Sequence, residues 1–287
     1  MSRILLTGAT GYLGSRIAQM LLHEHHSLLC PVLSDAPYDY LTPMLKQVDI
    51  TDSNGPGLTD SIFNFSPEII VHTAARYERG TISLTELTDA NLLFPLRILD
   101  AVLNTKSKVF WLNTDTSLDR SLNGYALSKH QFSEWGQYYA NKGLLDFCNV
   151  LLEQFYGSGD SGSKLFPYLY DKMSKNEPIE LTDGLQRRDM IYVDDVLNAY
   201  SILCQKRPTG YCEFPLGTGE APQVKEVITY FAELLNTKSE LQFGVLPKRE
   251  NEPTISIADT TQLQKAGFTC QYNWREGLKK MAEEMKA

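Results

Sequence analysis

The stretch Thr7-Gly8-Ala9-Thr10-Gly11-Tyr12-Leu13-Gly14 joins an apolar run over 4–7 to a segment over 12–23 whose apolar residues have helical spacing. Its glycines form a G-x-x-G-x-x-G pattern between a predicted strand and a predicted helix, which is typical of a turn that binds the pyrophosphate of a dinucleotide. The alternative is a structural turn without a ligand. A tight turn needs Gly8, a close approach of the backbone to the pyrophosphate needs Gly11, and close packing of the helix on the sheet needs Gly14. The residues predicted to bind this cofactor here are Gly8, Thr10, Gly11, Tyr12, Leu13 and Gly14.

Apolar runs and helical patterns alternate along the rest of the first half of the chain. Strands are predicted over 4–7, 28–33, 47–50, 69–74, 109–113 and 147–153, with helices over 12–23, 92–103 and 125–141. Such alternation implies right-handed crossovers and a parallel sheet. The sequence therefore predicts an α/β fold with a Rossmann-type doubly wound parallel sheet. We expect 1–157 to form this domain, with returns from about 185–210, and 158–287 to form mainly a smaller C-terminal lobe.

Composition excludes several classes of function. The 287 residues are 43% hydrophobic and carry a formal net charge of −8, and no Lys/Arg cluster stands out, so a nucleic-acid polymer is not expected as a partner. The five cysteines lack metal-ligand spacing, which predicts reduced thiols and no metal site. No apolar run reaches the roughly 18 residues of a membrane span, and no secretory signal is visible. We expect a cytoplasmic protein without a membrane partner.

A Tyr-x-x-x-Lys element, Tyr125-Ala-Leu-Ser-Lys129, opens the predicted helix over 125–141. Side chains four residues apart share one face of a helix. We expect the ammonium of Lys129 to lower the pKa of Tyr125 from its usual value of about 10, so that Tyr125 can exchange a proton with a substrate oxygen. The alternative is an exposed Tyr–Lys pair without a catalytic role.

Hydroxyl side chains follow the fifth predicted strand, in Asn113-Thr114-Asp115-Thr116-Ser117. Ligands of open α/β folds bind at the carboxyl ends of the strands, so a threonine here is placed to bond the same substrate oxygen as Tyr125. Thr114 and Thr116 share a face of an extended strand. Both stay candidates for this catalytic role.

The glycine turn, the hydroxyl strand end and the Tyr-x-x-x-Lys element, in this order, resemble the extended short-chain dehydrogenase/reductases, also called the NAD-dependent epimerase/dehydratase family. The resemblance covers nearly the whole chain and includes Asp49-Ile50, His72-Thr73-Ala74-Ala75 and the segment 184–195. It implies cofactor contacts from Asp49, Ile50, Thr73, Ala74, Ala75, Asn91 and Lys129. It also implies a nucleotide-sugar-binding C-terminal lobe, with substrate contacts from Arg76, Gln154, Arg188 and Arg249.

Within the family, the 4,6-dehydratases carry Thr-Asp-Glu where this chain has Thr114-Asp115-Thr116. The missing glutamate disfavours dehydration. The chain most resembles the nucleotide-sugar 4-ketoreductases of the CDP-abequose and CDP-paratose synthase type. This implies NAD(P)H-dependent reduction of the 4-keto group of a nucleotide-activated deoxysugar, in the biosynthesis of lipopolysaccharide O-antigen. The alternatives are a nucleotide-sugar 4-epimerase with tightly bound NAD and a non-catalytic dinucleotide-binding sensor.

The choice of cofactor depends on the end of the second predicted strand. There an acid would bind the ribose of NAD, and a basic residue would accept the phosphate of NADP. In Cys30-Pro31-Val32-Leu33-Ser34-Asp35, no acid stands at the expected place, Val32, and no arginine follows, whereas Ser34 is suited to a phosphate. NADP(H) is therefore favoured and NAD(H) stays open. A nucleotide sugar is the expected partner, and a homodimer is left open.

Overall fold

The computed structural model describes residues 1–78, 80–105, 107–248 and 252–286. The chain divides into two compact units. The first unit comprises Met1–Leu151 and Ala199–Phe214, and the second comprises Leu152–Asn198 and Pro215–Ala287. The expected division at residue 157 stays a prediction.

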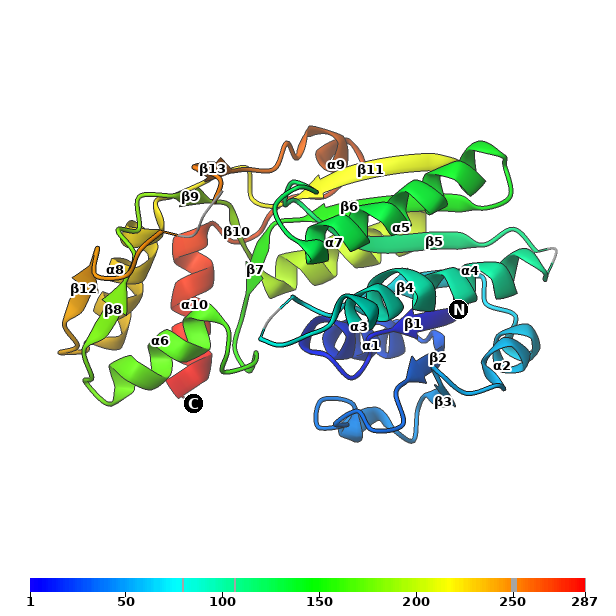
Figure 1. Cartoon of the computed structure of the whole chain (residues 1–287), viewed down its shortest axis with the longest axis horizontal. Helices are drawn as coiled ribbons and strands as arrows, with labels where there is room; N and C mark the ends of the chain where they lie inside the picture. Colours follow the sequence, from blue (N-terminus) through cyan, green and yellow to red (C-terminus); the bar gives the residue numbers. More distant parts are fainter. Residues whose placement is uncertain (79, 106, 249–251, 287) are drawn as a thin grey trace. The chain divides into compact units, whose positions relative to one another are not determined.

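The first unit alternates strands and helices, as its pattern of apolar residues predicts (Figure 1). Its first elements are β1 (Arg3–Thr7), α1 (Tyr12–His23), β2 (Ser27–Val32), η1 (Thr42–Met44), β3 (Asp49–Asp52), α2 (Leu58–Phe65) and β4 (Ile69–His72). They are followed by α3 (Leu84–Thr88), the π-helical η2 (Asp89–Leu93), α4 (Phe94–Leu103), β5 (Phe110–Thr116), α5 (Gly124–Asn141) and β6 (Asp146–Leu152). Most of α7 (Val193–Lys206) and of β11 (Tyr211–Leu216) also belongs to this unit.

A seven-stranded parallel sheet has the strand order β11-β6-β5-β4-β1-β2-β3. The register pairs Ile4 of β1 with Leu28 of β2 and with Ile69 of β4. The chain passes from β1 to β2 and β3 on one side of β1, and then crosses to β4 on its other side. The direction of the strand order therefore reverses beside β1. In open α/β sheets, ligands bind outside the carboxyl ends of the strands at such a switch point. The turn after β1 therefore lies where this fold binds ligands.

One face of the sheet packs against α2, α4 and α5 in the main hydrophobic core. Strand side chains on this face include Leu5, Ile70, Trp111 and Phe147. The α5 helix lies close to β6, since a Cβ at Gly136 would come within 2.2 Å of the Phe147 ring. This packing fixes the position of the helix that carries Tyr125 and Lys129.

Several element boundaries differ from those predicted. The strand predicted over 47–50 lies at Asp49–Asp52, because β3 pairs with β2 from Leu29 to Val32. The strand predicted over 109–113 continues to Thr116, which brings both candidate threonines into β5. The helix predicted over 92–103 is preceded by the π-helical turn over 89–93, a rare geometry that is frequent at functional sites.

The second unit contains shorter elements. They are β7 (Gln154–Tyr156), α6 (Leu165–Ser174), β8 (Ile179–Leu181), β9 (Arg187–Arg188), β10 (Met190–Tyr192), α8 (Val224–Leu235), β12 (Leu241–Phe243), β13 (Ile255–Ser256), α9 (Thr261–Lys265) and α10 (Trp274–Lys286). Three parallel strand pairs form, β7 with β10, β8 with β12 and β9 with β13. The buried Asp189 carboxylate holds their connections together by accepting hydrogen bonds from the backbone of Thr218, Gly219 and Ala258.

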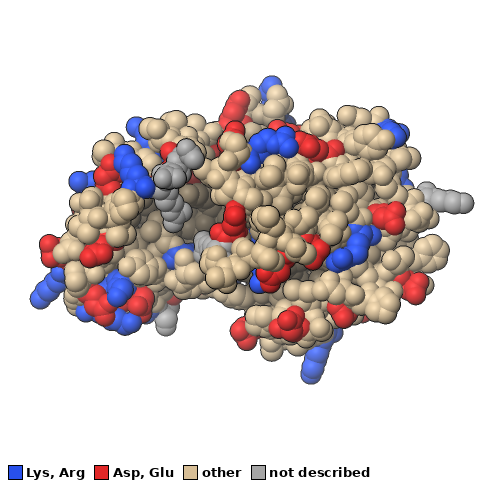
Figure 2. Space-filling model, viewed as in Figure 1, with Lys and Arg blue, Asp and Glu red and all other residues tan. Residues whose placement is uncertain are grey.

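Acidic and basic side chains are mixed over the face drawn in Figure 2. Among the described residues, no helix combines the length and the apolar character that a membrane span requires.

Candidate active site

The glycine turn connects β1 to α1 in the way that its pattern predicts. Gly8 has a φ of +74°, in the left-handed region that favours glycine. Gly11 caps α1 with an extended backbone and donates a hydrogen bond to the Gly8 carbonyl over 2.9 Å. The side chains of Tyr12 and Leu13 are largely buried, so their backbone N–H groups in the first turn of α1, rather than their side chains, are suited to an anion.

Gly14 fits against the turn so closely that a side chain has no room. A Cβ at this position would lie 2.0 Å from the Gly8 carbonyl oxygen and 2.9 Å from the Thr73 hydroxyl. We expect Gly14→Ala to destabilise the fold by about 1–3 kcal/mol, because the blocking atom belongs to the backbone of a constrained turn. Urea unfolding measures this effect. Gly57→Ala is the matched control, since a Cβ at Gly57 meets nothing within 4 Å. Equal stability of the two variants would contradict the close packing.

A hydrogen-bond cluster joins the ends of β1 and β4 beside this turn. The Thr7 hydroxyl oxygen accepts hydrogen bonds from the backbone N–H groups of Thr73 and Ala74, both at 3.2 Å. It also contacts His72 Nδ1 at 2.7 Å. Burial, with the charge of Lys129 adding to it, lowers the pKa of His72 well below its usual value, so the ring is neutral. The strand predicted over 69–74 therefore ends at His72, because Thr73 and Ala74 turn towards Thr7.

Asn91 connects the loop after β4 to α5. Its Oδ1 accepts a hydrogen bond from Arg76 N at 2.7 Å, and its Nδ2 donates to Arg76 O at 2.9 Å and to the Ser128 hydroxyl at 3.0 Å. The Asn91 side chain is fully buried. These contacts position the loop, and direct contact of Asn91 with a cofactor stays a prediction.

The candidate cofactor residues Asp49 and Ile50 lie on the edge strand β3, where both are exposed. Ala75 and the candidate substrate residue Arg76 are exposed in the loop after β4. Their accessibility is compatible with ligand binding, and their contacts stay predictions.

Both candidate threonines lie in β5, but their hydroxyl groups have different neighbours. The Thr114 hydroxyl is 2.6 Å from the Tyr200 hydroxyl, and the Thr114 side chain is half-buried. The Thr116 hydroxyl accepts a hydrogen bond from Leu118 N over 3.3 Å, and the Thr116 side chain is buried. Thr114 is therefore the more accessible of the two. Sequence reasoning missed Tyr200, because a contact across 86 residues has no local signal.

The α5 helix places Tyr125 and Lys129 on one face, after the Asn123 cap accepts a hydrogen bond from Ala126 N over 2.8 Å. Lys129 is only 2% exposed, and burial lowers the pKa of its ammonium to about 8, although the charge of Asp115 opposes this change. The Tyr125 side chain is half-buried, and its ring lies 4.8 Å from the ring of Tyr77.

The expected lowering of the pKa of Tyr125 is wrong for this structure. Burial, with contributions from Tyr77 and Asp115, raises the pKa of Tyr125 well above 10. The charge of Lys129 acts instead on Asp115 and on His72. Tyr125 is therefore a hydroxyl group with its proton in place at neutral pH.

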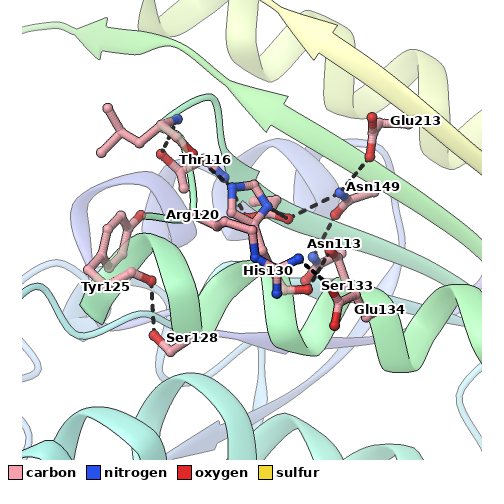
Figure 3. A network of polar contacts seen from close by, with 12 residues as sticks. Asn113, Thr116, Arg120, Tyr125, Ser128, His130, Ser133, Glu134, Asn149 and Glu213 are labelled. Atoms are coloured by element: carbon pink, nitrogen blue, oxygen red, sulfur yellow. Dashed lines mark hydrogen bonds and ion pairs between the residues drawn. The ribbon is translucent and has the colours of Figure 1, made fainter. Parts of the chain in front are cut away.

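Behind these residues lies a polar network that sequence reasoning missed (Figure 3). Asp115 Oδ2 is 3.2 Å from His130 Nδ1 and accepts a hydrogen bond from Asn149 Nδ2 over 3.1 Å. Asn149 also donates to Glu213 and accepts from Asn113. The side chain of Asp115 is fully buried. The sequence signal for this network was the presence of polar residues within apolar strands, since buried polar groups need hydrogen-bond partners.

The candidate substrate residues beyond the sheet lie in the second unit. Gln154 is exposed on β7. Arg188 is 4% exposed, and its guanidinium forms an ion pair with Glu252 at 2.9 Å. Arg249 lies outside the described residues. Substrate binding by these side chains stays a prediction. Among the described residues, no group of three or more His, Cys, Asp or Glu side chains is suited to a metal ion.

The fold and the site define a class of protein. A parallel sheet with a glycine turn after its first strand, a hydroxyl-bearing strand end and a Tyr-x-x-x-Lys helix is the arrangement of a short-chain dehydrogenase/reductase.

Comparisons with known proteins identify the family. The model of the NAD dependent epimerase/dehydratase family matches residues 4–212. CDP-abequose synthase of Salmonella typhimurium is 29% identical, with 98% of each chain covered. CDP-abequose synthase of Salmonella muenchen is 30% identical, over 97% of this chain and 96% of the relative. The structure of UDP-glucose 4-epimerase of Thermus thermophilus with NAD is similar with a TM-score of 0.83 at 20% identity, over 99% of each chain. This protein belongs to the NAD dependent epimerase/dehydratase family and is an oxidoreductase-type enzyme.

Proposed function

We propose that this enzyme reduces the 4-keto group of a nucleotide-activated deoxysugar, with a nicotinamide dinucleotide as hydride donor. The similarity to two CDP-abequose synthases supports a nucleotide sugar as the substrate class, and a role in surface polysaccharide biosynthesis. The side chains at the end of β5 support reduction over the other reactions of the family.

The state of Asp115 is the observation that carries this proposal. In a Thr-Asp-Glu dehydratase, the two carboxylates exchange protons with the substrate. Here the Asp115 side chain is fully buried and holds His130 and Asn149, so it is not available to a substrate. Thr116, in the place of the glutamate, is a neutral hydroxyl whose pKa is too high for a base. This strand end therefore lacks an accessible acid–base pair.

The protonated state of Tyr125 agrees with reduction. A ketone reductase requires a donor that carries its proton before hydride transfer. Burial favours the neutral, protonated form of Tyr125, so this proton is present on the side chain.

The residues of the first unit fit a dinucleotide. A Cβ at Gly11 would meet only the Gly8 carbonyl oxygen, at 3.3 Å, so the space in front of Gly11 is open. The backbone N–H groups at the N-terminus of α1 are suited to a pyrophosphate. When bound, the cofactor supplies the hydride for the C4 carbon.

The protein residues then have separate tasks. Tyr125 donates its proton to the oxygen of the former carbonyl. Thr114, or Thr116, donates a hydrogen bond to the same oxygen and orients it. Lys129 binds the nicotinamide ribose, and Asp115 favours the charged form of Lys129. Holding the reacting groups in one geometry supplies much of the acceleration.

The register of β3 bears on the choice between NADP and NAD. Val32 at the end of β2 pairs with Asp52 of β3, which is exposed. An acid beside this strand end favours the ribose hydroxyl groups of NAD, whereas Ser34 is suited to the phosphate of NADP. The proposed preference for NADP(H) rests on Ser34 alone. Assays with NADPH and with NADH distinguish the two cofactors.

The decisive experiment mixes the purified enzyme with a CDP-linked 4-keto-3,6-dideoxyhexose and either NADPH or NADH. We expect one cofactor to be oxidised for each ketone reduced, as measured by loss of the absorbance of the reduced nicotinamide together with product analysis by NMR. With a CDP- or dTDP-linked 4-hydroxyhexose alone, we expect no 4-keto-6-deoxy product. Steady formation of that product without net change of the cofactor would overturn the proposal.

The same measurements test the alternatives. Interconversion of two 4-hydroxy sugars without added cofactor, by protein that retains NAD on purification, would establish a 4-epimerase. Dinucleotide binding without turnover of either kind of sugar would establish a sensor. The presence of both Tyr125 and Lys129 argues against a sensor.

A further inference from the structure

The ring of His130 has an acceptor at each nitrogen. His130 follows Lys129 on α5, and Figure 3 shows its ring within the network at the end of β5. Nε2 is 2.8 Å from the carbonyl oxygen of Leu118, and Nδ1 is 3.2 Å from Asp115 Oδ2. A carbonyl oxygen can only accept a hydrogen bond, so Nε2 carries a proton. If the Asp115 oxygen is also an acceptor, Nδ1 carries a second proton and the ring is an imidazolium.

The neighbours of Asp115 select its charged form. Oδ1 accepts a hydrogen bond from Thr116 N over 2.8 Å, and Oδ2 accepts one from Asn149 Nδ2 over 3.1 Å. A protonated carboxyl group would lose acceptor capacity at a position where the N–H groups of Thr116 and Asn149 both donate to it. Although burial alone would raise the pKa of Asp115, the hydrogen bond from His130 and the charge of Lys129 hold this pKa below its usual value.

The other charged groups around His130 favour or oppose its protonated form. Asp119, on the loop after β5, interacts favourably with the imidazolium, and Arg120 on the same loop opposes it. Arg120 is itself paired with Glu134 of α5 at 2.6 Å. On β11, Glu213 contacts the network through Asn149 and accepts a hydrogen bond from Tyr211. The hydrogen bond with Asp115 is the largest contribution, and it raises the pKa of His130 above its usual value.

We propose that His130 is a positioning residue, whose imidazolium joins the Asp115 carboxylate and the Leu118 carbonyl and so fastens the threonine-bearing end of β5 to the helix that carries Tyr125 and Lys129. Asp115 and Leu118 lie on either side of Thr116, and His130 lies next to Lys129. One protonated ring therefore fixes the distance between the two parts of the candidate active site.

This arrangement has a defined dependence on pH. The stabilisation is complete below about pH 6.5, where the histidine of the unfolded chain is also protonated. It is lost as the pH rises through the raised pKa of folded His130, because a neutral ring keeps a single N–H and one of its two contacts breaks. The effect of His130→Gln on stability should therefore be largest in mild acid and smaller in alkali.

The protonation state can be measured without any substrate. We propose ¹⁵N NMR of protein with labelled histidine, titrated from pH 5 to 9, with His130→Gln to assign the signal and His23→Gln as a control for an exposed histidine. We expect His130 to titrate above 6.5 with both ring nitrogens protonated at pH 6, and Asp115→Asn to lower its midpoint. A His130 signal that titrates at or below 6.5, or one that Asp115→Asn leaves unchanged, would overturn the proposal.

The positioning role needs a kinetic test, and this part rests on the proposed reductase function. His130→Gln should lower kcat by about 100-fold, with KM for ketone and cofactor nearly unchanged, since misplacement of the reacting groups affects the transition state rather than binding. His23→Gln should leave both constants unchanged. Asp115→Asn combined with His130→Gln should cost no more than Asp115→Asn alone, because Asp115 also acts on Lys129 and Asn149, whereas His130→Gln breaks only the interaction that the two residues share.

The outcomes of the kinetic test are distinguishable. An unchanged kcat for His130→Gln, or additive effects in the double variant, would contradict positioning by this pair. Absence of turnover in the wild-type protein would contradict the proposed reaction, and the NMR titration would still decide the state of His130.

Discussion

Tyr125→Phe is expected to lower kcat by about 10²–10⁴-fold, the range over which a positioned general acid contributes. The substitution removes one hydroxyl group and keeps the ring, which packs 4.8 Å from the ring of Tyr77. Because the proposed dinucleotide contacts come from the turn before α1 and from Lys129, both of which the substitution keeps, cofactor affinity should change little. Single-turnover measurements of ketone reduction, together with calorimetry of cofactor binding, separate these two effects.

Tyr138→Phe is the matched control for this experiment. Tyr138 lies on the same helix, but it is 48% exposed and packs against Trp135 and Tyr139. Loss of the Tyr138 hydroxyl group should leave kcat unchanged. Near wild-type turnover by Tyr125→Phe would show that another group donates the proton, and the assignment of Tyr125 as the acid would be wrong.

Gly11→Val is expected to abolish dinucleotide binding while the protein still folds. The Gly11 backbone is extended, with φ −90° and ψ 169°, a conformation that valine also adopts. A Cβ there would meet only the Gly8 carbonyl oxygen, at 3.3 Å. Apart from this one tight contact, the branched side chain would occupy open space in the free protein, which is the space that a pyrophosphate needs.

A thermal-shift titration with NADPH and NADH measures this loss. Wild-type protein at 100 times its Kd should gain about 2.7 kcal/mol, and Gly11→Val should gain nothing. Gly57→Val is the matched control, because Gly57 also caps a helix and has open space around it, yet belongs to α2. Retained affinity in a folded Gly11→Val protein would reduce the turn to a structural role.

The parts that could be predicted from the sequence are local along the chain. The glycine pattern predicted the turn between β1 and α1, since the conformation of Gly8 and the cap at Gly11 depend on residues a few positions apart. The four-residue spacing predicted that Tyr125 and Lys129 share a face of α5, because helix geometry alone decides it. The alternation of apolar runs predicted the parallel sheet, whereas the boundaries of β3 depended on its pairing with β2.

Properties that depend on distant residues came only from the tertiary structure. The expectation of a lowered pKa for Tyr125 failed because burial, Tyr77 and Asp115 act on it through space, whereas sequence spacing revealed only Lys129. In the same way, an Asp after Thr114 resembled half of a dehydratase pair, until its burial against His130 and Asn149 made it part of the scaffold. Spacing along the chain determines which side chains share a helix or strand face. Protonation and accessibility depend on desolvation and on charges from other strands and helices, which only the folded chain brings together.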